Sequence, residues 1–172
     1  MPNKALFLDR DGVINEDFGY VWARENFFFK KGIFEVLEAA RDLGYKIIVV
    51  TNQSGIGRGM YSENDVKTLT RWFLSVLAKR GIAIAAVYYC PHAPSENCEC
   101  RKPKSGMFED AIKAFCLDPA KSVMIGDKES DIEAALGAGV GKTILLKSKY
   151  YPSPNTKANC RIKKLREAVK LL

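Results

Sequence analysis

Short apolar segments alternate with amphipathic stretches along the chain, and this alternation limits the fold more than any other feature of the sequence. Between the apolar segments, hydrophobic residues recur every three or four positions, which is the spacing of a helix with one buried face. Strands that alternate with such helices form a parallel sheet. The pattern predicts an α/β fold: a doubly wound, Rossmann-like, mostly parallel sheet with helices on both faces. The strands expected from the sequence are Lys4–Leu8, Lys46–Val50, Ala85–Tyr89, Ser122–Ile125 and Thr143–Leu146.

The length of the chain bears on the number of domains. A chain of 172 residues is long enough for one well-buried core and short for two, so we expect a single domain spanning residues 1–172. Residues 150–156 have a loop-like composition, and apolar residues at helical spacing then predict a C-terminal helix at about 163–172, packed on the sheet. Two capping-box pairs, Ser62 with Asp65 and Ser130 with Glu133, mark expected helix starts.

Charge and hydropathy restrict the location of the protein and its partners. The formal net charge is +7, which suits either nucleic acid or a small phosphorylated substrate. No apolar run approaches the roughly 18 residues of a membrane span. The first residues, Met1 to Lys4, show neither the apolar region nor the cleavage site of a secretory signal. We therefore expect a cytoplasmic protein with no membrane partner.

Two carboxylates, Asp9 and Asp11, come directly after the first expected strand. Side chains two residues apart on a strand point to the same side, and like charges that close ionise together only if a cation lies between them or one keeps its proton. Thr51 and Asp127 follow two other expected strands, and parallel sheets bind ligands at the carboxyl ends of their strands. These residues are expected to converge on a metal-assisted active site. Asp127 is the expected metal ligand, whereas Asp131 is either a supporting group or an early-helix charge.

Three of the five cysteines lie within eleven residues, together with the only histidine of the chain. Three thiolates and one imidazole form a suitable set for a closed, tetrahedral structural zinc site. The spacings are tighter than those of common zinc fingers, so reduced thiols without a metal are the alternative. Bound zinc would fix the loop at about 90–100 near the active site and take no part in catalysis. The expected zinc ligands are Cys90, His92, Cys98 and Cys100.

Two further segments could bind phosphate. The glycine-rich loop at 54–59 exposes main-chain amides, although such a loop taken alone is usually only flexible. Arg101 and Lys102 directly follow Cys100, and Pro103 prevents this basic cluster from being a helix face. A lysine there could neutralise a phosphoryl group, and an arginine could grip two oxygens of a substrate. The alternative for the cluster is a solvated charge run.

Taken together, these motifs resemble the four ordered signatures of the haloacid dehalogenase-like (HAD-like) phosphatases. The signatures are Asp9-X-Asp11-Gly12-Val13, Thr51, Lys102 and Gly126-Asp127. The sequence resembles one branch of this family more closely, the D-glycero-D-manno-heptose 1,7-bisphosphate 7-phosphatases, over residues 5 to about 146. The segments that carry this closer likeness are Asp9–Asn15, Gly19–Val21, Thr51–Gly59, the Cys/His loop and Cys100–Pro103.

The resemblance implies a Mg²⁺-dependent phosphatase that removes the 7-phosphate of the heptose bisphosphate through an aspartyl-phosphate. The reaction would belong to the biosynthesis of nucleotide-activated heptose for lipopolysaccharide core or a related glycan. It implies that Asp9 is the nucleophile and Asp11 the acid and base. Thr51 and Lys102 would hold the phosphoryl oxygens. Mg²⁺ would bind Asp9, Asp127 and the main-chain carbonyl of Asp11.

The resemblance also implies an open pocket without a large cap domain. The residues that would wall this pocket or meet the sugar and its distal phosphate are Asp17, Phe18, Gly19, Tyr20, Asn52, Gln53, Ser54, Arg101 and Lys128. The implied partner is a small phosphorylated sugar. Nothing in the sequence demands more than a monomer, so a monomer is expected. The anomer of that sugar is not decided by the sequence.

Three other functions would use some of the same motifs. A histidinol-phosphate phosphatase has the same aspartates and a similar zinc loop, but Gly19–Val21 and the loop at 54–59 favour the heptose branch. A phosphatase of nucleic-acid 3′ ends would share the fold, but the aromatic and basic pattern of strand binding is absent from the sequence. A zinc-dependent nucleic-acid-binding module would use the charge and the Cys/His loop and leave the aspartates without a role. We expect no nucleic-acid partner.

Overall fold

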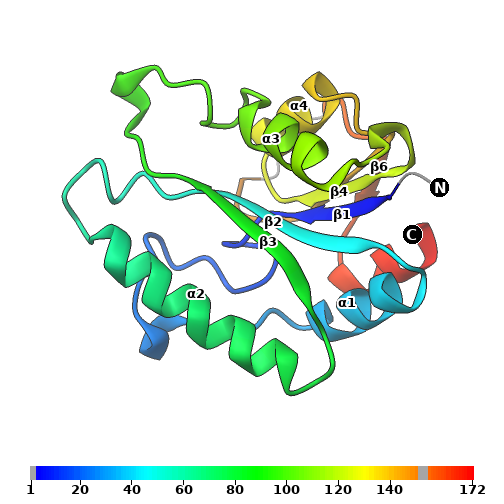
Figure 1. Ribbon diagram of the computed structural model, residues 1–172, viewed down its shortest axis with the longest axis horizontal. Helices are drawn as coiled ribbons and strands as arrows, with labels where there is room; N and C mark the ends of the chain where they lie inside the picture. The colour runs from blue at the N-terminus through cyan, green and yellow to red at the C-terminus, as the bar shows by residue number, and fades with distance from the viewer. Residues whose placement is uncertain (1–2, 151–154) are drawn as a thin grey trace.

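The computed structural model describes residues 3–150 and 155–172. In this part of the chain, six strands form one sheet in the order β3-β2-β1-β4-β5-β6, and all neighbouring strands are parallel (Figure 1). The expected parallel sheet is therefore confirmed. The strands are β1 (Ala5–Leu8), β2 (Lys46–Asn52), β3 (Ile84–Cys90), β4 (Val123–Gly126), β5 (Lys142–Leu146) and β6 (Cys160–Ile162).

Helices cover both faces of the sheet, as the alternation predicts. The helices α1 (Ile33–Asp42) and α2 (Glu63–Ala78) lie on one face, and α3 (Gly106–Phe115) and α4 (Glu129–Gly137) lie on the other (Figure 1). Successive side chains of β1 point to opposite faces, so Leu6 and Leu8 pack with residues of α1 and α2, whereas Ala5 and Phe7 pack with residues of α3 and α4. A strand buried on both faces needs apolar residues at every position, which explains the unbroken apolar run.

The C-terminal part differs from the prediction. A short edge strand, β6 (Cys160–Ile162), precedes the predicted helix and was not expected from the sequence. The segment that follows, Leu165–Leu171 (η4), is a 3₁₀ helix that packs mainly against α1. Leu165 and Ala168 are the residues it buries. Of the predicted loop at 150–156, residues 151–154 lie outside the described residues.

One of the two predicted helix starts is correct. Ser62 caps α2 as expected, since its hydroxyl accepts from the main-chain N–H of Asp65 at 3.1 Å and the Asp65 carboxylate accepts from the N–H of Ser62 at 2.8 Å. The helix start predicted from Ser130 and Glu133 is wrong, because α4 already begins at Glu129. The carboxylate of Asp131 caps this helix instead, accepting from the N–H of Lys128 at 3.1 Å.

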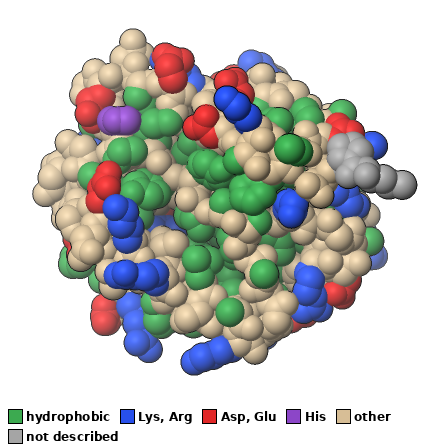
Figure 2. Space-filling model, in the orientation of Figure 1, with side chains coloured by type: hydrophobic (Ala, Val, Ile, Leu, Met, Phe, Trp, Pro, Cys, Tyr) green, Lys and Arg blue, Asp and Glu red, His purple; other side chains and the backbone are tan. Residues whose placement is uncertain are grey.

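Charge distribution and helix hydropathy complete the description of the fold. Lysine and arginine side chains are interspersed with acidic and apolar ones over the face shown in Figure 2. No helix within the described residues combines the length and apolar character needed to cross a membrane.

Candidate active site

Polar residues from four neighbouring strands meet at the carboxyl edge of the sheet. Asp9 follows β1, Thr51 lies near the end of β2, Cys90 ends β3, and Asp127 follows β4. Because all of these strands are parallel, their carboxyl ends lie along one edge, where parallel sheets bind ligands. The structure therefore brings together the groups that the sequence places after separate strands.

Three buried carboxylates form the floor of this site. Asp9, Asp127 and Asp131 are each at most 5% exposed, and one oxygen from each lies within 4.8 Å of the others. Burial, followed by the charge of Asp131, raises the pKa of Asp9 to about 6. Burial, followed by the charges of Asp9 and Asp131, raises the pKa of Asp127 to about 8. The site therefore resists carrying three negative charges unless a cation compensates them.

Asp127 is the carboxylate with unused binding capacity. Both of its buried oxygens have no hydrogen-bond donor among the described residues. Orphaned carboxylate oxygens beside a second carboxylate are the hard oxygen ligands that Mg²⁺ prefers, so the residues present fit this ion. The carboxylate of Asp11 is not part of this group of three.

Gly12 permits the close approach of this carboxylate. Its backbone has φ +91°, and a Cβ atom at this position would lie 2.2 Å from Oδ2 of Asp127. Any other residue would therefore displace the Asp127 carboxylate. The glycine of the Asp-X-Asp-Gly motif thus supplies space for the Asp127 carboxylate as well as a turn.

The pKa shifts predict how Mg²⁺ and pH together change stability. Asp9 and Asp127 ionise near pH 4 in the unfolded chain but at about 6 and about 8 in the metal-free fold, so stability is present at low pH and is lost as the pH rises toward 8. Mg²⁺ should offset this loss, and thermal unfolding should show a larger Mg²⁺-induced rise in Tm at pH 8 than at pH 5. In an Asp127→Asn variant, both the pH dependence and the Mg²⁺ effect should weaken. An equal Mg²⁺ effect in that variant would contradict the assignment of this ligand.

Lys102 is the buried cation of the site. Its Nζ lies 3.2 Å from Oδ1 of Asp9 and 2.6 Å from Oδ1 of Asp131, and it donates to the main-chain oxygen of Val50 at 2.8 Å. Burial alone would lower the pKa of Lys102, but Asp131 and Asp9 together raise it above its usual value. The lysine is therefore charged at neutral pH. The side chain of Asn52 fixes the main chain here, donating to the carbonyl of Lys102 and accepting from its N–H, both at 3.1 Å.

Asp11 is held by three donors. Nη2 of Arg10 lies 2.9 Å and 3.0 Å from the two oxygens of Asp11, and Asn15 donates to Oδ1 at 2.9 Å. Gln53 donates to Oδ2 at 3.0 Å. Arg10 also donates to the carbonyl of Val21, which ties the carboxylate to the segment that walls the pocket. Arg10, which is only 1% exposed, was not expected from the sequence, because a charged residue inside the motif has no distinguishing pattern.

A cavity of about 430 Å³ opens above these groups. Most of the residues expected to meet the substrate line it, together with residues that were not expected, Tyr61, Pro103, Ser130 and Tyr150. The expected ones that line it are Asp11, Asp17, Gly19, Tyr20, Asn52, Gln53, Ser54, Arg101, Lys102 and Lys128.

Phe18 is the exception among the predicted pocket residues. The structure does not place it on the cavity: its side chain is 66% exposed and packs edge-to-face on Phe28, with 5.9 Å between ring centroids. The chain turns directly after Asp17, whose carboxylate accepts from the main-chain N–H of Gly19 at 2.9 Å. Asp17 is paired there with two lysines, Lys128 at 4.0 Å and Lys149 at 3.6 Å.

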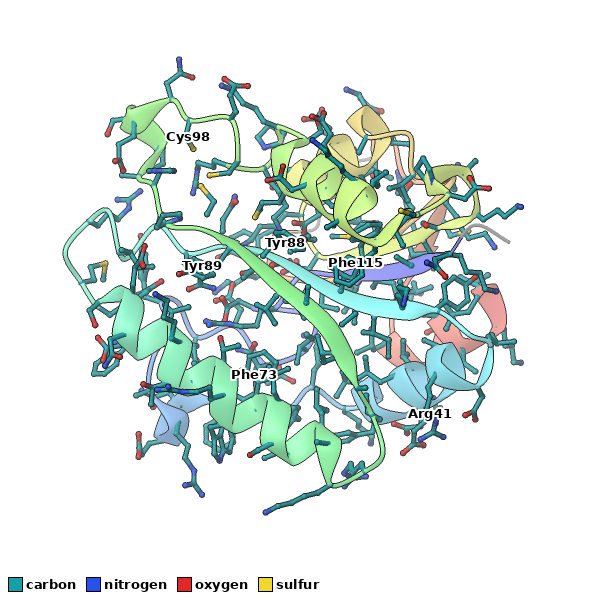
Figure 3. The ribbon with its side chains drawn as sticks, in the orientation of Figure 1. Arg41, Phe73, Tyr88, Tyr89, Cys98 and Phe115 are labelled. Carbon is teal, nitrogen blue, oxygen red and sulfur yellow. The ribbon has the colours of Figure 1, made fainter. Side chains whose placement is uncertain are left out.

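The four predicted zinc ligands lie together beside the cavity. Figure 3 shows Cys98 on the loop that follows β3, with other sulfur atoms close to it. Five distances between the ligand atoms, three S–S and two S–Nδ1, range from 2.8 to 3.6 Å, and the cysteines are free thiols. A tetrahedral Zn²⁺ with Zn–S bonds of about 2.3 Å separates its sulfur ligands by roughly 3.8 Å. The cluster is therefore slightly contracted, and its donor set fits zinc.

The Cys/His loop is joined to the active site by main-chain hydrogen bonds. The carbonyl of Cys90 accepts from the N–H of Gln53 at 2.8 Å, and the carbonyl of Pro91 accepts from the N–H of Gly57 at 2.8 Å. At its other end, Cys100 directly precedes Arg101 and Lys102. A metal in this loop would therefore brace both sides of the cavity.

Curated relatives match nearly the whole chain. A D-glycero-beta-D-manno-heptose-1,7-bisphosphate 7-phosphatase from Helicobacter pylori is 48% identical over 160 residues, covering 92% of each chain. A D-glycero-alpha-D-manno-heptose-1,7-bisphosphate 7-phosphatase from Burkholderia mallei is 46% identical, covering 100% of this chain and 95% of the relative. The chain belongs to the heptose bisphosphate phosphatase family.

Structural comparison agrees with membership of the heptose bisphosphate phosphatase family. The crystal structure of D,D-heptose 1,7-bisphosphate phosphatase from B. bronchiseptica, complexed with magnesium and phosphate, superposes with a TM-score of 0.90 at 26% identity, covering 98% of this chain and 97% of that chain. A family model described as HAD-hydrolase-like matches residues 99–168. The chain is thus a HAD-like hydrolase, and a relative of the same fold holds magnesium and phosphate.

Proposed function

We propose that this protein is a Mg²⁺-dependent phosphatase that removes the 7-phosphate of D-glycero-D-manno-heptose 1,7-bisphosphate. The observation that carries the chemistry is the buried group at the floor of the cavity, where Asp9 lies beside the orphaned carboxylate of Asp127 and the cation of Lys102. The names of the relatives support the substrate. The reaction would serve the synthesis of nucleotide-activated heptose for lipopolysaccharide core or a related glycan.

Each catalytic role follows from the chemistry of its residue. Asp9 would attack phosphorus in line and form an aspartyl-phosphate, which divides hydrolysis into two easier steps. Asp11 would protonate the departing sugar oxygen and later accept a proton from the attacking water. Lys102 and Thr51 would hold the phosphoryl oxygens whose charge changes during transfer.

The proposed metal ligands are Asp9, Asp127 and the main-chain carbonyl of Asp11. Mg²⁺ at this position would reduce the repulsion between the nucleophile and the phosphate dianion that it attacks. Asp131 would support the site without binding the ion, since one of its oxygens pairs with Lys102 and the other accepts two main-chain N–H groups.

Two cations on the cavity wall suit the second phosphate of a bisphosphate. Nη1 of Arg101 is buried and has no hydrogen-bond partner among the described residues, so it can bind a substrate oxygen. Lys128 lines the cavity, 4.0 Å from Asp17. We propose that Arg101 and Lys128 bind the distal phosphate, while Ser54 and Asp17 contact the sugar.

The test of this function is phosphate release with Mg²⁺ from both anomers of the heptose bisphosphate, beside histidinol phosphate and an aryl phosphate. We expect kcat/KM for one bisphosphate anomer to exceed the others by about tenfold or more, a difference of roughly 1.4 kcal/mol, with only the 7-phosphate lost. The relatives include enzymes named for each anomer, so the assay also assigns the anomer. A preference for histidinol phosphate would refute the substrate and retain the chemistry.

We further propose that Cys90, His92, Cys98 and Cys100 bind a structural Zn²⁺. Removal of the metal with a chelator should lower Tm by roughly 5 °C or more, because the binding energy of a structural zinc contributes to folding. Elemental analysis of protein purified without chelator should find one zinc per chain. As a control, a variant of Cys116, which lies outside the cluster, should respond to the chelator like the unaltered protein. Less than stoichiometric zinc in protein purified without chelator would contradict the proposal.

A further inference from the structure

The side chain of Gln53 links the two groups that would act on opposite ends of the scissile bond. It is 2% exposed, and its Nε2 donates to Oδ2 of Asp11 at 3.0 Å and to Oγ1 of Thr51 at 2.9 Å. Both amide hydrogens are therefore used within the protein. Gln53, which the sequence suggested as a substrate contact, thus has the geometry of a residue that orients others.

The remaining polar atom of this amide is held by a tyrosine. The hydroxyl of Tyr61 donates to Oε1 of Gln53 at 2.7 Å, and this bond is buried. The amide of Gln53 therefore turns its nitrogen toward Asp11 and its oxygen toward Tyr61, and the hydroxyl of Tyr61 favours this orientation over the flipped one. Since Thr51 accepts from Gln53, its own hydroxyl hydrogen is left to donate to a phosphoryl oxygen.

Local packing fixes the position of Tyr61. The residue is 8% exposed, and a Cβ atom on Gly55 would lie 2.1 Å from its ring. The turn that brings Gly55 and Tyr61 together is closed by a hydrogen bond from the N–H of Met60 to the carbonyl of Gly55 at 2.8 Å. Burial also raises the pKa of Tyr61, so its hydroxyl is protonated and able to donate at neutral pH.

We propose that Tyr61 is a positioning residue for the phosphatase reaction, which orients the carboxyl group of Asp11 by holding the amide of Gln53. This inference rests on the proposed function, because it takes Asp11 as the acid that protonates the leaving group. Tyr61 lines the cavity, and its hydroxyl reaches Asp11 through the amide of Gln53. Its loss should therefore weaken acid catalysis and leave the attack by Asp9 intact.

The leaving group of the substrate provides the test. Departure of an alkoxide needs a proton from the acid, whereas a nitrophenolate leaves without one. In Tyr61→Phe, which keeps the ring and removes only the hydroxyl, kcat/KM for the sugar bisphosphate should fall by about tenfold to a hundredfold, which is part of the roughly 10²–10⁴-fold that general acid catalysis contributes. For p-nitrophenyl phosphate it should fall by less than about threefold. Tyr45→Phe, which removes a tyrosine hydroxyl bonded to the carbonyl of Leu172 far from the site, should match the unaltered protein with both substrates.

A double-mutant cycle tests the route through Gln53. Gln53→Met should lower kcat/KM for both substrates, because Thr51 also loses its donor, with the larger loss on the sugar bisphosphate; adding Tyr61→Phe to it should cause no further loss. Equal losses with both substrates in Tyr61→Phe, full activity in Tyr61→Phe, or additive losses in the double variant would each overturn the inference. Failure of the unaltered protein to hydrolyse any phosphate ester would instead refute the proposed function. Thermal unfolding of each variant shows whether a loss comes from misfolding.

Discussion

Replacement of Asp9 by Asn should abolish phosphate release and leave the fold intact. The amide has nearly the same shape as the carboxylate but lacks the charged oxygen that would attack phosphorus. We expect kcat to fall roughly 10⁴-fold or more, as when other enzymes lose their nucleophile. The variant should remain folded, because Lys102 keeps its 2.6 Å pair with Asp131. Initial rates with Mg²⁺ and a thermal unfolding curve measure the two effects separately.

The matched control is Asp42→Asn. Asp42 is an exposed carboxylate at the end of α1, 2.8 Å from Arg41, and its loss should leave kcat unchanged. Activity of Asp9→Asn within about tenfold of the unaltered protein would remove Asp9 as the nucleophile.

Replacement of Lys102 by Met should cost both activity and stability. The methionine has a similar length, but it leaves Asp9 and Asp131 buried without the cation that lies between them. Removal of one partner from a buried ion pair typically destabilises a protein by about 3–5 kcal/mol. Loss of a charge that stabilises the transferring phosphoryl group should also lower kcat by about 10²–10³-fold. Urea unfolding of the metal-free protein and kcat/KM of the Mg²⁺-loaded protein are the measurements.

Two further variants separate the effect on stability from the effect on activity. Lys104→Met removes a lysine that pairs with Glu99 at 2.8 Å on the surface, and it should change stability by less than about 1 kcal/mol. Lys102→Met combined with Asp131→Asn removes one buried charge of each sign, so it should regain part of the stability and none of the activity. A stable, fully active Lys102→Met variant would contradict both roles of this lysine.

The fold could be predicted from the sequence wherever burial determines the residue types. β1 is recognisable because a strand covered on both faces needs the unbroken run Ala5–Leu8. β6 could not be recognised, since a three-residue edge strand with an exposed arginine at its centre, Arg161, carries no such run. The final apolar residues do have helical spacing, but they form a 3₁₀ helix against α1, and the sequence pattern does not distinguish the two helix types.

The candidate site could be predicted where one strand end supplies one functional group. Asp9, Thr51 and Asp127 follow this pattern. The roles of Asp131, Arg10 and Tyr61 depend on contacts with residues distant along the chain or on burial of a polar side chain, and no local pattern reports either. Asp131 illustrates the difficulty, because its 2.6 Å contact with Lys102 joins segments that only the sheet topology brings together.

The three contacts of Asp131 also connect the site to the cooperativity of folding. Through main-chain N–H groups of Asp127 and Lys128 this carboxylate holds the end of β4 and the first turn of α4, and through Lys102 it reaches the segment that follows the Cys/His loop. Fraying of the first turn of α4 would therefore remove one partner of Lys102 and disturb the group of three carboxylates in the same event. Exchange of the amide hydrogens at the start of α4 should therefore report opening of the active site, because the side chain of Asp131 bonds to both the helix start and the site.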